Sequence, residues 1–270
     1  MIKDITIGQY FPGNSVIHKL DPRVKLVLDI LYLVILFTAQ SFTGVLLAAL
    51  FIVVCYMLAR IKFVMILKSV KPIVPLMLFT AVLNILFIKG EEPIFSWWLI
   101  TIFPEGVEMA FFMLMRVLTL IVGMSLLTYT TSPIMLTDAI EQLLSPLKKV
   151  RFPVHELSMM MTIALRFIPT LVEETDKIMS AQKARGAEMD SGGLLKKAKS
   201  LVPVLIPLFV SAFKRANELA TAMECRCYHG GEGRTRLKTL KTAARDYVAI
   251  VIMLVLLAAV IVINCFPIVP

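Results

Sequence analysis

The chain has 270 residues, 58% of them apolar, and a formal net charge of +9 at neutral pH. Soluble domains are roughly 45–50% apolar, so this composition, with a mean hydropathy of +0.83, excludes an ordinary soluble protein and indicates an all-α membrane protein. Nucleic acid is not an expected partner, because no segment interleaves aromatic residues with Lys and Arg. The basic residues suit the anionic headgroups of a lipid bilayer instead.

Five apolar runs predict about five transmembrane helices, since a helix needs about 20 residues to cross a bilayer and the shorter runs reach this length with their flanking residues. The runs cover residues 26–37, 45–59, 72–88, 107–127 and 247–266. No short apolar core with a small-residue cleavage site precedes the first run. We therefore expect no removable signal peptide.

The charges between the runs predict their orientation, because Lys and Arg gather on the cytoplasmic side. Four basic residues precede the first run and four follow the second, whereas residues 40–43 are uncharged. The loop after the third run is rich in Glu and holds Trp97 and Trp98, whose rings suit the outer interface. We expect a multi-pass protein with its N-terminus and residues 130–246 in the cytoplasm and its C-terminus outside.

This layout divides the chain into residues 1–129 with four spans, a cytoplasmic helical domain over residues 130–246, and a last span over residues 247–270. The middle segment carries 18 of the 28 Lys and Arg residues. Helical spacing of its apolar residues predicts three long amphipathic helices. The first begins at Ser132-Pro133, and Pro146 weakens its end. The second runs from near Val154 to Arg185, with a bend at Pro169, and Gly186 follows it. The third follows Gly193 and runs to Tyr228.

One face of the third helix is a wide apolar stripe, which can lie on a membrane surface or pack against another membrane protein. Its members recur at helical spacing, and Lys214, Arg215 and Glu218 lie away from it. The stripe consists of Phe209, Phe213, Ala216, Ala220 and Met223, with Cys227 as its extension.

No catalytic or metal site emerges from the sequence. His155-Glu156 begins like a zinc protease helix, but the position of the second histidine holds Met159. Cys225 and Cys227 have no second pair with which to bind zinc, and the glycines of residues 230–235 lack the spacing of a phosphate-binding loop. We expect no metal or cofactor in this chain, so any ATP would be bound by another.

Asp29 and Arg116 are ionisable residues within predicted spans, where a charge is costly unless it is paired or hydrated. A transport pathway through this chain alone is one interpretation, which keeps an independent secondary carrier as an alternative function. Pairing or a contact between helices is the simpler interpretation. A membrane-embedded enzyme is the third hypothesis, and the sequence shows no nucleophile or metal constellation for it.

Two arginines end long cytoplasmic helices in matching contexts, Ala184-Arg185-Gly186 and Cys225-Arg226-Cys227. For either one alone, a cation that meets the negative end of a helix dipole is a sufficient explanation. Together they suggest a second role. A planar guanidinium between small neighbours can enter a narrow slot on another protein and form hydrogen bonds there.

At these residues the chain resembles the T component of energy-coupling factor transporters, which are ABC-type importers of vitamins and other micronutrients in prokaryotes. The resemblance extends over nearly the whole chain. The matching stretches are residues 8–13 and 18–23, 152–156 and 164–170, 181–187, and 222–228.

The resemblance implies a non-catalytic scaffold in the prokaryotic cell membrane. In this family, a T component joins two ABC ATPases, which bind ATP and Mg²⁺, to a membrane S component that binds the substrate. The family's two x-Arg-x motifs, which dock into grooves of the two ATPases, match Ala184-Arg185-Gly186 and Cys225-Arg226-Cys227. The apolar stripe would contact the S component, and one scaffold could serve several interchangeable S components.

Overall fold

The computed structural model describes residues 10–90, 95–97, 100–150, 152–187, 193–230, 240 and 242–265. Chain contacts divide them into two compact units. One, here called the membrane unit, comprises Gly8–Ala139 and Leu240–Pro270; the other, here called the α7–α8 unit, includes Ile140–Thr239.

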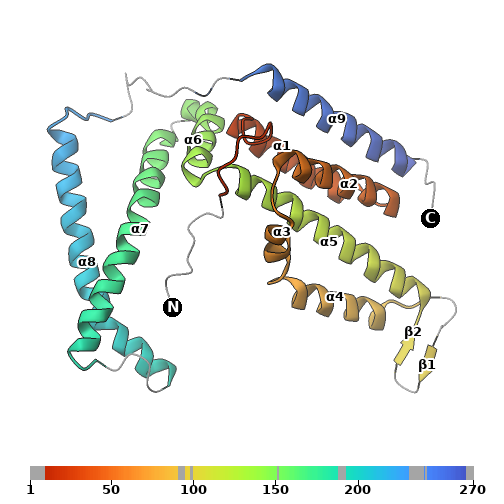
Figure 1. The fold of residues 1–270 in the computed structure, drawn as a ribbon, viewed down its shortest axis with the longest axis horizontal. Coiled ribbons are helices and arrows are strands. Elements are labelled where there is room, and N and C mark those ends of the chain that lie inside the picture. Colours follow the sequence, from red (N-terminus) through yellow and green to blue (C-terminus); the bar gives the residue numbers. More distant parts are fainter. Residues whose placement is uncertain are drawn as a thin grey trace. The chain divides into compact units, whose positions relative to one another are not determined.

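The membrane unit contains most of the helices (Figure 1). In chain order its elements are α1 (Pro22–Thr38), α2 (Phe42–Ala59), α3 (Phe63–Val70), α4 (Val74–Phe87), the strands β1 (Phe95–Trp97) and β2 (Ile100–Ile102), α5 (Pro104–Thr130) and α9 (Ala244–Cys265). Helix α6 (Pro133–Leu143) follows α5 at the boundary between the units.

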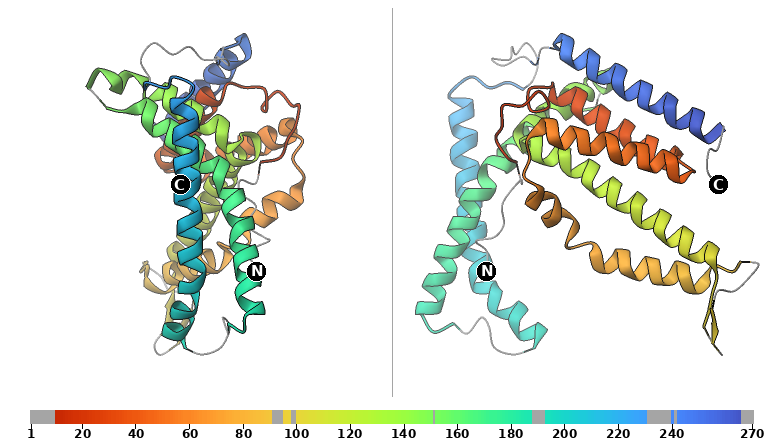
Figure 2. Two further views of the ribbon diagram at one scale, coloured as in Figure 1. Left: turned by 90° about the vertical axis from the view of Figure 1, so that its left-hand side faces the viewer. Right: turned by 45° about the vertical axis from the view of Figure 1, so that its right-hand side comes forward.

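Helices α1, α2, α5 and α9 pack side by side around the apolar core of the membrane unit (Figures 1 and 2). Tyr32 and Tyr56 lie in this core, and each hydroxyl is satisfied by a carbonyl of a neighbouring helix, that of Ala48 at 3.2 Å and that of Val122 at 2.9 Å. A Cβ at Gly123 would lie 2.2 Å from the ring of Tyr32. A glycine is therefore required for α5 to approach α1 this closely.

Three described helices, α2, α5 and α9, are long and apolar enough to cross a membrane, and α3 with α4 forms a fourth candidate bent by 59°. Helix α1 has 17 residues, which is slightly short of a full span. The third predicted span, residues 72–88, is thus the second half of a broken element. Pro72 explains the break, because it has no N–H to continue α3.

A small β-hairpin lies where an irregular loop was expected. Strands β1 and β2 pair antiparallel, with Phe95 opposite Ile102. The protein is otherwise helical over the described residues, which confirms the predicted all-α class. Trp98 and the glutamates at 91 and 92 lie outside the described residues.

The α7–α8 unit contains the 3₁₀ helix η1 (Ser145–Val150), α7 (Val154–Ala184) and α8 (Leu194–Glu224). Helices α7 and α8 pack as an antiparallel pair, in which Glu174 meets Arg215 and Gln182 meets Pro203. The predicted starts of both helices are confirmed, as is the end of α7 before Gly186. The predicted end of α8 at Tyr228 is wrong, because α8 ends at Glu224.

Candidate functional site

Helix α7 ends in a Schellman motif that presents Arg185. The N–H of Ala187 donates to the carbonyl of Gln182 and the N–H of Gly186 donates to that of Lys183, both at 3.0 Å. These two bonds satisfy carbonyls that the end of a helix leaves free. They require a left-handed residue at position 186, and Gly186 supplies it with φ of 86°.

Helix α8 ends in the same motif. The N–H of Tyr228 donates to the carbonyl of Met223 at 3.1 Å, and that of Cys227 donates to the carbonyl of Glu224 at 2.9 Å. The left-handed residue is Cys227, with φ of 55°. A residue with a Cβ pays about 1–2 kcal/mol for this conformation. No local pattern predicts a left-handed cysteine here, and the expected helix therefore continues to Tyr228.

The two arginines therefore occupy equivalent positions, each immediately before the left-handed residue of its motif. Both side chains are exposed, and neither has a hydrogen bond or ion pair within the part of the chain that the structure describes. Their flanking residues are exposed too: Ala184, Gly186, Cys225 and Cys227. Both guanidinium groups are free to bind another molecule and favourably placed at the negative end of a helix dipole.

The antiparallel pairing places these motifs at opposite ends of the α7–α8 pair (Figures 1 and 2). Arg185 lies one turn beyond Gln182, which contacts Pro203 of α8. Arg226 lies 23 positions further along the chain than Pro203. At 1.5 Å per residue, this separation is on the order of 30 Å, so one small partner domain would not reach both arginines with the same groove.

Helix α8 turns a polar side to α7 and an apolar side outward. Glu174 of α7 accepts hydrogen bonds from Ser211 and, at 2.9 Å, from the guanidinium of Arg215. On the outward side, Phe209 and Phe213 are 63% and 66% exposed. Two large aromatic side chains exposed to this degree are typical of a surface that a partner covers.

The predicted apolar stripe coincides only in part with the exposed groove of α8. Ala216 and Ala220 are exposed and Met223 is half-buried. A shallow groove instead follows Phe209 and Phe213 toward the end of α8. Its lining consists of Ile206, Phe209, Val210, Phe213, Lys214, Asn217, Glu218, Thr221, Ala222 and Cys225. Lys214 and Glu218, which were expected to lie off the apolar face, border this groove, and Cys225 joins it to the Arg226 motif.

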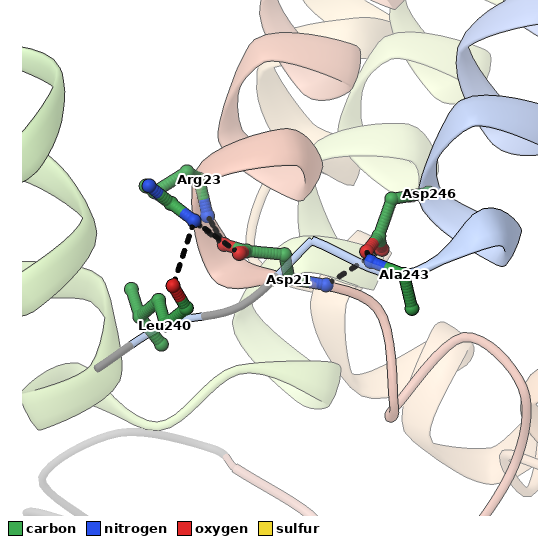
Figure 3. Close-up of polar contacts among 5 residues, drawn as sticks. All are labelled: Asp21, Arg23, Leu240, Ala243 and Asp246. Atoms are coloured by element: carbon green, nitrogen blue, oxygen red, sulfur yellow. Dashed lines mark hydrogen bonds and ion pairs between the residues drawn. The ribbon is translucent and has the colours of Figure 1, made fainter. Parts of the chain in front are cut away.

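A buried polar cluster joins the start of α1 to the start of α9 (Figure 3). Asp246 is 1% exposed and accepts from the N–H of Asp21 at 2.9 Å and from the N–H of Ala243 at 2.6 Å. The guanidinium of Arg23 donates to the carboxylate of Asp21 at 2.7 Å and to the carbonyl of Leu240 at 3.2 Å. The cluster thus fixes the segment by which the chain re-enters the membrane unit.

Asp21 also caps α1, where its carboxylate accepts from the N–H of Arg23 at 2.9 Å. Burial alone would raise the pKa of Asp21, but the hydrogen bonds and charge of Arg23, together with the charge of Lys25, hold it below its ordinary value. The ammonium of Lys25 donates to the carbonyl of Thr130, at the end of α5, at 2.9 Å. The end of α5 and the segment by which the chain re-enters the membrane unit are therefore both tied to the start of α1.

Comparison with known proteins agrees with these features. Residues 13–237 match the family model described as cobalt transport protein, CbiQ. The energy-coupling factor transporter transmembrane protein EcfT of Clostridium kluyveri is 57% identical over 257 residues, 95% of each chain. EcfT of Ruminiclostridium cellulolyticum is 54% identical over 91% of this chain and 92% of its own, and that of Bacillus subtilis is 47% identical over 96% and 97%. The chain belongs to the EcfT family. It is a transmembrane component of an energy-coupling factor transporter.

The two ionisable residues within predicted spans of this EcfT family member, Asp29 and Arg116, do not contact each other. Arg116 of α5 donates to the carbonyl of Ala39, and its guanidinium lies 4.5 Å from the centre of the Phe112 ring. Arg116 thus makes the contact between helices that its position in the sequence favours. Asp29 is half-buried in α1 and has no hydrogen-bond or ion-pair partner among the described residues.

His155, at the start of α7, makes a polar contact with α6. Its Nδ1 lies 3.4 Å from the carboxylate of Glu141, which also accepts from the hydroxyl of Ser158 at 2.6 Å. No group of three potential metal ligands occurs within the described ranges. The contact ties α6 to the start of α7.

Proposed function

We infer that this EcfT family member is the coupling subunit of its transporter. It would transmit the conformational changes of two ABC ATPases, which hold ATP and Mg²⁺, to an S component that binds a vitamin or another micronutrient. The observation that carries this proposal is the pair of exposed arginines in equivalent Schellman motifs at the ends of α7 and α8. In this proposal the α7–α8 unit lies in the cytoplasm of a prokaryotic cell.

Each arginine would enter a groove of one ATPase. A guanidinium offers five donors in a planar fork, and carbonyls or carboxylates in a groove can accept several of them together. The rigid cap behind each arginine supports this role, because it holds the backbone of the tip in one conformation before binding. The distance between the tips supports two separate ATPase subunits.

The exposed face of α8 would hold the S component. Phe209 and Phe213 present apolar area with few directional polar groups, so packing, rather than a fixed pattern of hydrogen bonds, would stabilise the contact. Such a face can accept several interchangeable S components. Substrate specificity would then reside in the S component and not in this chain.

The test is co-purification of the ATPases with Arg185→Ala, Arg226→Ala and the double variant. Loss of a guanidinium buried against acceptors costs about 2–5 kcal/mol at that contact, so each single variant should release one ATPase and the double variant both. Arg166→Ala, a change of the same type in the middle of α7, is the control. If the double variant retained both ATPases, the docking role would be wrong. The two arginines would then only stabilise the ends of their helices.

The same preparations separate the coupling role from an independent carrier. The purified chain, reconstituted by itself into vesicles, should take up no substrate, and uptake should appear only with the ATPases, ATP and an S component. Uptake by the single chain would support the secondary carrier instead.

A further inference from the structure

The two arginine tips share a geometry but differ in chemistry. The α7 tip, residues 184–186, has Ala184 and Gly186 beside its arginine, whereas the α8 tip, residues 225–227, has Cys225 and Cys227. Both thiols of the α8 tip are exposed. Two further cysteines lie elsewhere, Cys55 partly buried in the core of the membrane unit and Cys265 at the end of α9.

The α8 tip has the features of a site for thiol modification. Accessible thiols exchange with disulfides, whereas buried ones are inert. Arg226 lies between the two cysteines, and its unpaired positive charge attracts anionic reagents. Cys225 also borders the open groove of α8, so a small molecule can approach it from that side.

We propose that the α8 tip is a modification site for anionic low-molecular-weight disulfides, and that the adduct prevents Arg226 from docking. The second half of the proposal rests on the coupling function proposed above. The α7 tip has no thiol and would not respond. One of two geometrically equivalent contacts would then be sensitive to oxidised thiols and the other insensitive.

The reaction is a thiol–disulfide exchange. The sulfur of Cys225 or Cys227, having lost its proton, attacks one sulfur of the disulfide R–S–S–R and forms Cys–S–S–R. The S–S bond of the reagent breaks, and the R–S⁻ that leaves takes up the proton. The cysteine is oxidised and the leaving half of the reagent is reduced, so no other oxidant is needed, and excess thiol reverses the step.

A mixed disulfide fits the geometry better than a bond between the two cysteines. Residues two apart at a helix end do not face each other, and a bond between Cys225 and Cys227 would require the backbone hydrogen bonds of the α8 cap to open. A mixed disulfide leaves the cap intact. It places carboxylates and bulk beside Arg226, where they pair with the guanidinium and cover it.

The experiment treats the purified full-length chain with oxidised glutathione, removes the reagent, and maps the adducts by peptide mass before the ATPases are added. We expect adducts on Cys225 and Cys227 that dithiothreitol removes, and the loss of one of the two ATPases on co-purification. The matched control is Cys225→Ala/Cys227→Gly, which gives the α8 tip the sequence of the α7 tip, with a glycine at the left-handed position. Its retention of the ATPases is measured before and after the same treatment, which should not change it.

Arg226→Ala without oxidant separates the two proposals. If it releases one ATPase while the fully modified chain keeps both, the thiol proposal is wrong and the docking proposal stands. If Arg226→Ala keeps both ATPases, the docking proposal is wrong, and with it the effect assigned to the adduct. Absence of adducts on Cys225 and Cys227 overturns the modification site whatever the ATPases do.

Discussion

At the scale of single residues, the left-handed positions 186 and 227 decide how α7 and α8 end. Gly186 adopts φ of 86° at no steric cost, whereas Cys227 adopts φ of 55° with a side chain attached. The glycine could be predicted from the sequence, because glycine after a helical pattern is the usual stop. The cysteine could not, since no local rule favours it in this conformation.

Reciprocal substitutions at these positions should therefore have different effects. Gly186→Ala should weaken the end of α7 by about 1 kcal/mol, because alanine is strained at this φ although no atom lies within 4 Å of the added Cβ. Cys227→Gly should not weaken the end of α8. Hydrogen–deuterium exchange of the amides at 186–187 and 227–228 measures both effects. Faster exchange in Cys227→Gly than in Gly186→Ala would contradict this account.

Asp21 should make the membrane unit sensitive to acid. Its pKa in the folded protein is lower than the ordinary value of 3.8, so its contribution to stability is complete above that value and is lost as the pH falls through the lowered pKa. In Asp21→Asn, the fall in melting temperature between pH 7 and pH 3 should be smaller than in the unchanged protein. Glu218→Gln, at an exposed position of α8, is the control and should leave that fall unchanged.

At the scale of elements, prolines and glycines next to the helices predicted α7 and the start of α8. Contacts between residues far apart in the sequence could not be predicted. Pro153 and Gly186 bracket α7, and Gly193 precedes α8. In contrast, Asp246 meets Asp21 across 225 positions, and no spacing rule connects two such residues. The bend between α3 and α4 had a visible cause in Pro72, but α3 itself was not predicted, because Lys68 and Lys71 gave its residues the character of a basic loop.

The outward face of α8 should be separable from its tip. Ala216→Asp adds a charge on the exposed stripe that an apolar partner would have to desolvate, so it should weaken the binding of every S component to a similar degree while both ATPases remain bound. Co-purification of each partner measures this. Ala216→Ser is the matched control with a small uncharged side chain. Loss of the ATPases with retention of the S component would reverse the roles assigned to face and tip.

At the scale of the whole molecule, the charge distribution predicts which side of the membrane each segment occupies. Single cysteines at Lys89, after α4, and at Gly193, before α8, should react with an impermeant maleimide from opposite sides, in a chain without the four native cysteines. Lys89 should be labelled from outside and Gly193 from the cytoplasm. Labelling of both from one side would refute the five-span topology and the cytoplasmic position of both arginines.

The family and the all-α class could be predicted at this scale because both depend on features spread along the whole chain, such as the apolar runs and the separate motifs. The number of complete spans could not be predicted as firmly. Helix α1, with 17 residues, and the broken pair of α3 and α4 are each close to the minimum length, so composition alone does not decide how they lie in a bilayer.

The prolines of the α7–α8 pair determine where it can act as a lever. Pro203 and Pro207 each remove an N–H donor from the first half of α8, so bending is easiest there. Beyond them, Ser211 and Arg215 fasten α8 to Glu174 of α7. The stretch from residue 211 to Arg226 and the part of α7 around Glu174 should therefore move together as a stiff arm. A force on Arg226 would rotate this arm about the segment that holds Pro203 and Pro207, and the exposed side chain of Phe213 would move with it.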